Sequence, residues 1–80
     1  MVKFNVGDWI EFEHDEGITI CKVISKSSPE IVKSPRLRMF SGRTPFGRHV
    51  GDYCNRVIRV LPWHVMAAYE LLSVLSDVQE

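Results

Sequence analysis

The chain has 80 residues, of which 45% are apolar and 25% are charged. These values are typical of a folded globular domain and exclude a disordered or collagen-like chain. Ten basic side chains offset ten acidic ones, so the formal net charge of zero does not by itself indicate a polyanionic partner. The length predicts a single domain over residues 1–80.

The first part of the chain predicts a β-hairpin. Residues 9–14 predict the first strand: Ile10 and Phe12 lie on one face and Glu11 and Glu13 on the other, which is the two-residue period of a half-buried strand. Residues 18–24 are rich in β-branched side chains and predict the second strand. Between them, residues 15–17 form a tight-turn signal in which Gly17 can take a positive φ.

The middle of the chain predicts a third strand that is interrupted. Residues 30–33 begin this strand, and Pro35 breaks it because proline cannot donate to a central ladder. Residues 36–39 then alternate again, so we expect Leu37 and Met39 to point inward. The glycines and the proline between residues 41 and 51 predict a long exposed loop.

The last part of the chain predicts one more strand and a helix. Residues 56–61 form the strand, and Pro62 marks the change to a helical period over residues 63–78. One side of this helix is polar, but its apolar arc spans about 200°, twice what an ordinary surface helix needs. We expect this arc partly to cap a barrel and partly to form an oligomer or partner contact, through Trp63, Leu71, Leu72, Leu75 and Val78.

The arrangement of the predicted strands resembles an SH3-like small β-barrel of the KOW or Tudor type. The resemblance rests on the pattern Phe-x-Val-Gly-Asp-x-Ile at residues 4–10 and on the hairpin turn at 15–17, and it covers residues 4–61. It implies a binding module. The chain has no Ala-Leu-Tyr-Asp-Tyr-like segment and no tandem tryptophan, so polyproline binding is not expected. The predicted fold is mainly β: an antiparallel SH3-like barrel of four to five strands over 4–61, with a C-terminal α-helix over 62–78.

The charges are distributed unevenly along the chain. Residues 1–30 carry three basic and six acidic side chains, a formal charge of −3. Residues 31–60 carry seven basic side chains and one acidic one, or +6, and residues 61–80 carry three acidic ones, or −3. The basic middle is therefore the part that indicates a partner.

The leading candidate site is the stretch 33–49, which contains five basic side chains, two phenylalanines and no acid. Cations for phosphates and planar rings for stacking are the mixture that nucleic-acid binding needs. The alternatives are an acidic protein surface as partner, or a solvated loop with both phenylalanines in the core. With the neighbouring strand included, the candidate residues are Lys33, Arg36, Arg38, Phe40, Arg43, Phe46, Arg48, Arg56 and Arg59.

The sequence carries no strong signal for catalysis or for a cofactor. His14, His49, His64, Cys21 and Cys54 are scattered, without a C-x-x-C motif or a histidine pair at helical spacing, so no metal site is expected. His49 and Cys54 lack a supporting nucleophile motif, and the glycines match no phosphate-binding loop. We expect no catalytic residue and no cofactor. One further binding possibility is an aromatic cage for a cation, formed by Trp9, Phe12 and Tyr53.

The sequence thus predicts a non-enzymatic binding module, nucleic-acid-associated or regulatory, that uses the basic Arg/Phe loop. The alternative is a small adaptor or inhibitor, of the kind phages and mobile elements encode, that docks on a larger protein through the Arg-rich face and the helix. No secretory signal or apolar stretch of 18 residues is evident. We therefore expect a cytoplasmic protein with two reduced thiols, no membrane segment, and a homodimer formed by the helix.

Overall fold

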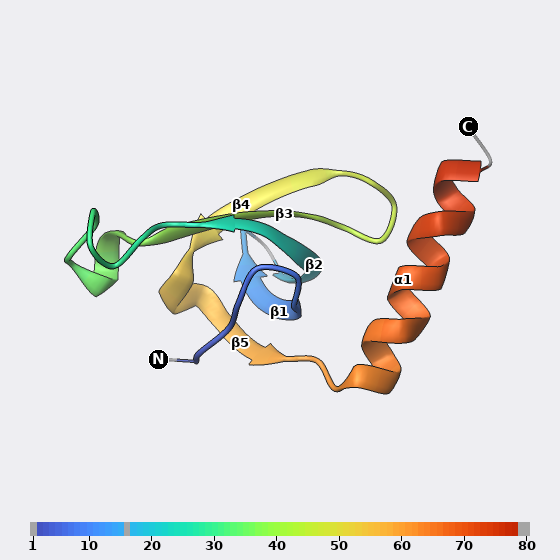
Figure 1. The fold of residues 1–80 in the computed structure, drawn as a ribbon, viewed down its shortest axis with the longest axis horizontal. Helices are drawn as coiled ribbons and strands as arrows, with labels where there is room; N and C mark the ends of the chain where they lie inside the picture. Colours follow the sequence, from blue (N-terminus) through green and yellow to red (C-terminus); the bar gives the residue numbers. More distant parts are fainter. Residues whose placement is uncertain (1, 16, 79–80) are drawn as a thin grey trace.

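The computed structural model describes residues 2–15 and 17–78, with side chains as far as Leu75. The fold is mainly β, as predicted: five antiparallel strands form one sheet, and a C-terminal helix follows (Figure 1). The elements are β1 (Trp9–His14), β2 (Gly17–Lys26), β3 (Met39–Arg43), β4 (His49–Tyr53), β5 (Val57–Val60) and α1 (Trp63–Val78).

The strand order in the sheet is β4-β3-β2-β1-β5, so the last strand pairs with the first. The two edge strands, β4 and β5, are joined only by the short 3₁₀ turn Cys54–Arg56. Four residue steps from Tyr53 to Val57 span at most about 14 Å. Four strand spacings in a flat sheet would separate the edges by about 19 Å. The sheet must therefore curl so that its two edges approach each other.

The concave side of the curled sheet holds the core. Phe40 packs edge-to-face between Phe12 and Phe4, with ring centroids 5.0 Å and 5.6 Å apart. Both cysteines are free and buried, and burial raises the pKa of the Cys21 thiol to about 12. The two thiols therefore act as small apolar side chains. The buried cluster consists of Phe4, Ile10, Phe12, Cys21, Val23, Phe40, Cys54 and Val57.

The predicted β1–β2 hairpin is confirmed, but its turn differs in one detail. Asp15, not Gly17, has the positive φ, at 48°. Aspartate tolerates this left-handed conformation better than most residues. Gly17 instead begins β2, where it pairs with His14.

The prediction for residues 30–39 is wrong. Residues 30–33 form no strand, and Pro35–Leu37 is a 3₁₀ helix because proline fixes a φ suited to its first turn. The strand β3 begins only at Met39, with Phe40 directed into the core. Leu37 and Met39, which were expected to point inward, are 62% and 45% exposed.

The long loop predicted for residues 41–51 is also wrong, because most of it forms the β3–β4 hairpin. The glycines in it have two different uses. Gly47 lies in the turn with a φ of +85°. Gly42 lies in β3, where a Cβ atom would clash with the carbonyl oxygen of Lys22 and lie 2.8 Å from the Sγ of Cys21. Glycine at position 42 therefore allows the close approach of β3 to β2.

We expect Gly42→Ala to lower the free energy of unfolding by about 1–3 kcal/mol, because the added methyl group overpacks the sheet. Gly17→Ala is the matched control. Position 17 also lies in a strand, but its added Cβ would have no neighbour within 4 Å, so its effect should stay within about 0.5 kcal/mol. Urea denaturation followed by circular dichroism measures both, and equal effects of the two substitutions would contradict this account of Gly42.

The helix packs on the convex side of the sheet through its polar side. Trp9 is 1% exposed, its ring stacks on Tyr69 with centroids 5.5 Å apart, and its Nε1 donates to Oε1 of Glu70 at 3.0 Å. Nζ of Lys22 lies 2.6 Å from the same Oε1. Together the Lys22 and Trp9 hydrogen bonds hold the pKa of Glu70 below its usual value. Glu70 is therefore a charged residue that links α1 to both β1 and β2.

The predicted helix over 63–78 is confirmed, but its apolar arc does not cover the sheet as expected. Trp63, Leu71, Val74 and Leu75 are 78%, 62%, 55% and 50% exposed. On the convex side of the sheet, the large side chain to be covered is Trp9. A buried indole packs best with a ring partner and a hydrogen-bond acceptor for its N–H. Tyr69 and Glu70, on the polar side of the helix, supply both of these. No described helix is long and apolar enough to cross a membrane.

Candidate functional site

The predicted basic segment is divided between the two ends of the molecule. Lys33, Arg36 and Arg38 belong to the connection between β2 and β3, at the left of Figure 1. Arg43 and Arg48 flank the β3–β4 turn, which lies toward the opposite end of the molecule, the end where α1 is located. The β3–β4 hairpin thus places Arg43 and Arg48 far from Lys33, Arg36 and Arg38, and the five basic residues do not form one patch.

The two phenylalanines of the segment also have different environments. Phe40 is 3% exposed and lies in the core, whereas Phe46 is 73% exposed at the β3–β4 turn. The Arg43 guanidinium beside this turn donates through Nε to Nε2 of His49 at 3.3 Å. Phe46 is therefore the one member of the predicted pair that a partner could contact.

The two arginines expected to extend the patch are paired with acids. Nε of Arg59 donates to Oε2 of Glu11 at 2.6 Å, and Nε of Arg56 lies 3.9 Å from Oδ1 of Asp52. Burial alone would raise the pKa of Asp52, but hydrogen bonds from His14 and from the Tyr53 N–H outweigh it and lower this pKa. Asp52 is thus a carboxylate at neutral pH, and the charges of Arg56 and Arg59 are locally offset.

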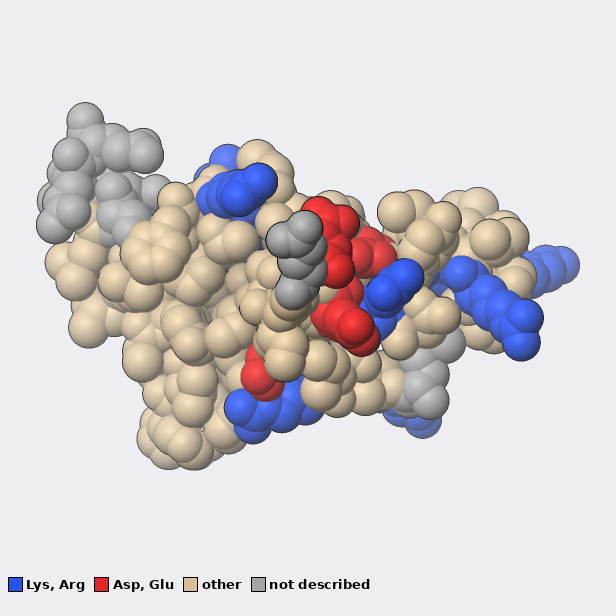
Figure 2. All heavy atoms as spheres, turned by 180° about the vertical axis from the view of Figure 1, so that it is seen from behind, with Lys and Arg blue, Asp and Glu red and all other residues tan. Residues whose placement is uncertain are grey.

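Cations without a carboxylate partner gather around the β2–β3 connection. In Figure 2, which shows the molecule from behind, blue Lys and Arg side chains lie at the right-hand end, where this connection is located, and red acidic ones lie in the middle. No described carboxylate lies within 4 Å of these cations, although the exposed Glu30 belongs to the same connection. We call this group the basic end: Lys3, Lys26, Lys33, Arg36 and Arg38.

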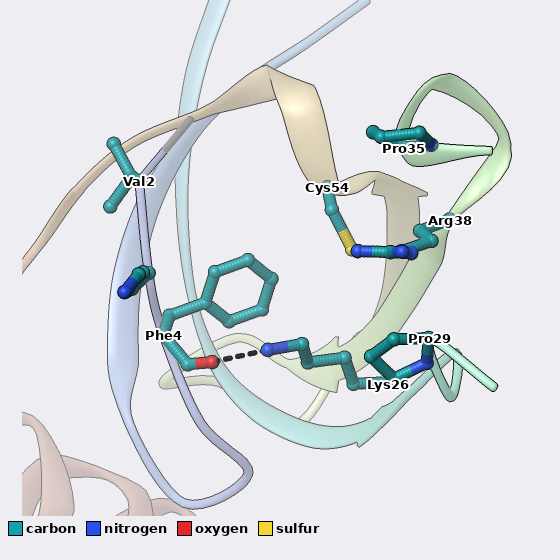
Figure 3. A pocket seen from close by; sticks show the side chains of 8 residues that line it. Val2, Phe4, Lys26, Pro29, Pro35, Arg38 and Cys54 are labelled. Atoms are coloured by element: carbon teal, nitrogen blue, oxygen red, sulfur yellow. Dashed lines mark hydrogen bonds between the residues drawn. The ribbon is translucent and has the colours of Figure 1, made fainter. Parts of the chain in front are cut away.

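The basic end surrounds a cavity of about 290 Å³ (Figure 3). Three of its cations line the cavity, the walls are otherwise mostly apolar, and the lining contains no acidic side chain. The volume is at the small end of the range for ligand pockets, roughly 300–1,000 Å³, and suits a group no larger than one nucleotide. The lining residues are Val2, Lys3, Phe4, Lys26, Pro29, Pro35, Arg38 and Cys54.

Backbone carbonyl groups accept hydrogen bonds from two of the cations that line the cavity, Lys26 and Arg38. Nζ of Lys26 donates to the carbonyl oxygen of Phe4 at 2.6 Å and lies 4.6 Å from the centroid of its ring. Nε and Nη2 of Arg38 donate to the carbonyl oxygens of Val32 and Lys33 at 2.9 Å and 3.3 Å. A carbonyl group orients a cation without cancelling its charge. Both charges therefore remain available to an anion in the cavity.

The thiol of Cys54 in the cavity wall has a raised pKa. Figure 3 shows the Arg38 guanidinium pointing toward the Cys54 thiol. Burial raises the pKa of this thiol, and the charges of Lys26 and Arg38 oppose the rise without reversing it. The reactive form of cysteine is the thiolate, so Cys54 serves as part of the apolar wall.

Two of the cations at the cavity were missed by the sequence reasoning. Lys3 and Lys26 lie outside the basic stretch 33–49, in the N-terminal part that appears acidic as a whole. Only the fold brings them to Arg38, and no local pattern marks them.

The predicted aromatic cage does not form. Trp9 lies under α1 on the convex side, Phe12 is fully buried in the core on the other side, and Tyr53 is 40% exposed. Successive β1 positions face opposite sides of the sheet, so residues 9 and 12 cannot converge.

Of the predicted helix residues, Leu72 is half-buried and the Val78 side chain lies outside the described part.

Within residues 2–15 and 17–75, no three His, Cys, Asp or Glu side chains are placed to hold a metal ion.

A scan against protein-family models, a search of curated proteins and a search of solved structures each found no match to this chain. The basic end and the exposed side of the helix are therefore the two features of the chain that bear on its function.

Proposed function

We propose that this protein is a non-enzymatic binding module that binds the phosphate backbone of a nucleic acid at the basic end. The observation that carries the proposal is the group of five cations without a described carboxylate partner, three of which line one small cavity. Cations that approach phosphates release condensed counterions, and this release drives binding independently of sequence. The curled five-stranded sheet supports the resemblance to small barrels, which also implies a binding role.

The cavity supports a single-stranded ligand rather than a duplex. Pro29 and Pro35 in its lining are exposed apolar surfaces on which one unstacked base can rest, and Lys26 and Arg38 are positioned for the adjoining phosphate. In a duplex the bases are paired and stacked, and the flat face of a base cannot enter a cavity of this size. Lys33 and Arg36, both exposed, would contact the neighbouring phosphates.

The test is a fluorescence-anisotropy titration in which the protein is added to a labelled single-stranded RNA of 12 nucleotides and mixed sequence. The titration is repeated at salt concentrations from 20 to 300 mM. Lys33→Gln with Arg36→Gln removes two exposed cations of the basic end. We expect this variant to bind about 10–30-fold more weakly at 0.1 M salt, and its slope of log K against log salt to fall in magnitude by about 1.4.

The matched control is Arg56→Gln with Arg59→Gln, which changes the net charge equally at cations already paired with Asp52 and Glu11. We expect it to lose no more than a few-fold in affinity. An equal loss in both double variants would show that net charge alone matters, and no binding by the natural chain at 20 mM salt would overturn the proposal.

A second candidate is an adaptor or inhibitor that docks on an acidic protein surface. It is favoured by the exposed Phe46 and by the cations on either side of it, Arg43 and Arg48. This function predicts that the oligonucleotide titration shows no salt-dependent binding. The two free, buried thiols support a reducing, cytoplasmic setting for either function.

A further inference from the structure

The outer side of α1 is an exposed apolar surface that the basic end does not use. Trp63, Leu71, Val74 and Leu75 are each at least half exposed, and two alanines between them are exposed as well. Figure 1 shows α1 at the edge of the molecule, with the sheet on one side of it only. Surfaces of this kind usually mark an interface.

Leu71 lies near the middle of this exposed side. The helix contacts the sheet through Tyr69 and Glu70, and at about 100° per residue Leu71 is about 160° around the axis from Tyr69. Small and large residues are placed symmetrically about position 71. Ala67 precedes it by four residues and Leu75 follows it by four, while Ala68 and Val74 lie three residues before and after it.

We propose that a second copy of this chain covers the outer side of α1, with the two helices antiparallel and the two-fold axis at Leu71. In this register Leu71 meets Leu71 of the second copy, each Leu75 lies opposite an Ala67, and each Val74 lies opposite an Ala68. Large side chains therefore face small ones in the layers on either side of the central Leu71 pair. An interface with two-fold symmetry must be self-complementary, and this distribution of sizes meets that condition.

Charge is compatible with the same arrangement. Among the described residues of the exposed side, His64 is the only polar one, and α1 contains no Lys or Arg. Two such surfaces therefore meet without burying an Asp, Glu, Lys or Arg side chain of the described part of α1. The antiparallel orientation also places the positive end of each helix dipole beside the negative end of the other.

The size of the surface sets the expected strength of the dimer. An exposed apolar patch of this type covers on the order of 300–600 Å². Stable complexes bury about 800 Å² on each partner. We therefore expect a dissociation constant in the micromolar range, with dimer at high protein concentration and monomer on dilution.

Sedimentation equilibrium of the whole chain between 2 and 500 µM tests the proposal. We expect a reversible monomer–dimer equilibrium that Leu71→Glu weakens at least 30-fold, while circular dichroism shows unchanged thermal unfolding at low concentration because Leu71 is 62% exposed. Ile31→Glu is the matched control: Ile31 is 83% exposed in the β2–β3 connection, and its substitution should leave the equilibrium unchanged. A chain that stays monomeric at 500 µM, whether or not it captures another protein, would overturn the proposal.

The register is tested by disulfide formation under mild oxidation at 300 µM. The natural thiols are buried, so one introduced thiol on α1 reacts alone. Leu71→Cys should give a disulfide-linked dimer because position 71 meets itself, whereas Val74→Cys should give little because position 74 meets position 68. Equal cross-linking of both variants would indicate parallel helices and contradict the antiparallel register.

Discussion

Replacing Trp9 by alanine is expected to lower the free energy of unfolding by about 3–5 kcal/mol, the range for deletion of a large buried aromatic side chain. Trp9 is 1% exposed and supplies both the ring that stacks on Tyr69 and the N–H that Glu70 accepts. Without it, α1 loses its main contact with the sheet. Urea denaturation measures the loss of stability, and hydrogen exchange should show faster exchange in α1 than in β2 or β3.

Two control substitutions separate the roles of Trp9. Trp9→Phe keeps an aromatic ring but removes the indole N–H. We expect a smaller loss of unfolding free energy than for Trp9→Ala, of which the lost hydrogen bond to Glu70 accounts for about 1 kcal/mol. Trp63→Ala removes a tryptophan that is 78% exposed, and the stability of the monomer should change by no more than about 0.5 kcal/mol. If Trp9→Ala left the exchange rates of α1 unchanged, the helix would be held by other contacts.

Phe40→Ala is the second substitution with a large expected effect, again about 3–5 kcal/mol of unfolding free energy. Phe40 is 3% exposed and packs edge-to-face against Phe4 and Phe12, so its removal leaves a cavity between three parts of the chain. Thermal and urea denaturation measure the effect.

Phe46→Ala is the matched control for Phe40→Ala because it makes the same chemical change six residues away. Phe46 is 73% exposed, and we expect a change within about 0.5 kcal/mol. Similar losses for the two substitutions would mean that the β3–β4 hairpin places Phe46 differently from the arrangement described above.

The elements that the sequence predicted well are those with a sustained period. The alternation over 9–14 and the helical pattern over 63–78 each repeat often enough to determine type and bounds. Residues 30–51 failed for a physical reason. Proline and glycine mark loops by default, yet Pro35 begins a 3₁₀ helix, and Gly42 allows two strands to approach closely. Whether a proline or glycine ends an element, begins a helix or allows close strand packing depends on the residues that contact it in the folded chain. The neighbouring sequence does not identify those contacts.

The candidate site was predictable only in part for a related reason. Lys33, Arg36 and Arg38 were identified by a local excess of positive charge. The pairing of Arg59 with Glu11 depends on the β1–β5 register, 48 residues apart, and local composition cannot indicate it. Likewise, the polarity of the helix sides was correctly assigned, but the side that would face the sheet was decided by Trp9.

The cavity at the basic end is assembled from three segments that are distant in the sequence: residues 2–4, residues 26–38 and Cys54. An unfolded chain does not hold these segments together, so a ligand that fits the cavity binds the native state alone. Occupancy and folding are then thermodynamically linked, and a ligand present at 100 times its dissociation constant adds about 2.7 kcal/mol to the stability. With a ligand bound in this cavity, a small domain of this kind would gain a substantial part of its resistance to unfolding and to proteolysis of the unfolded chain.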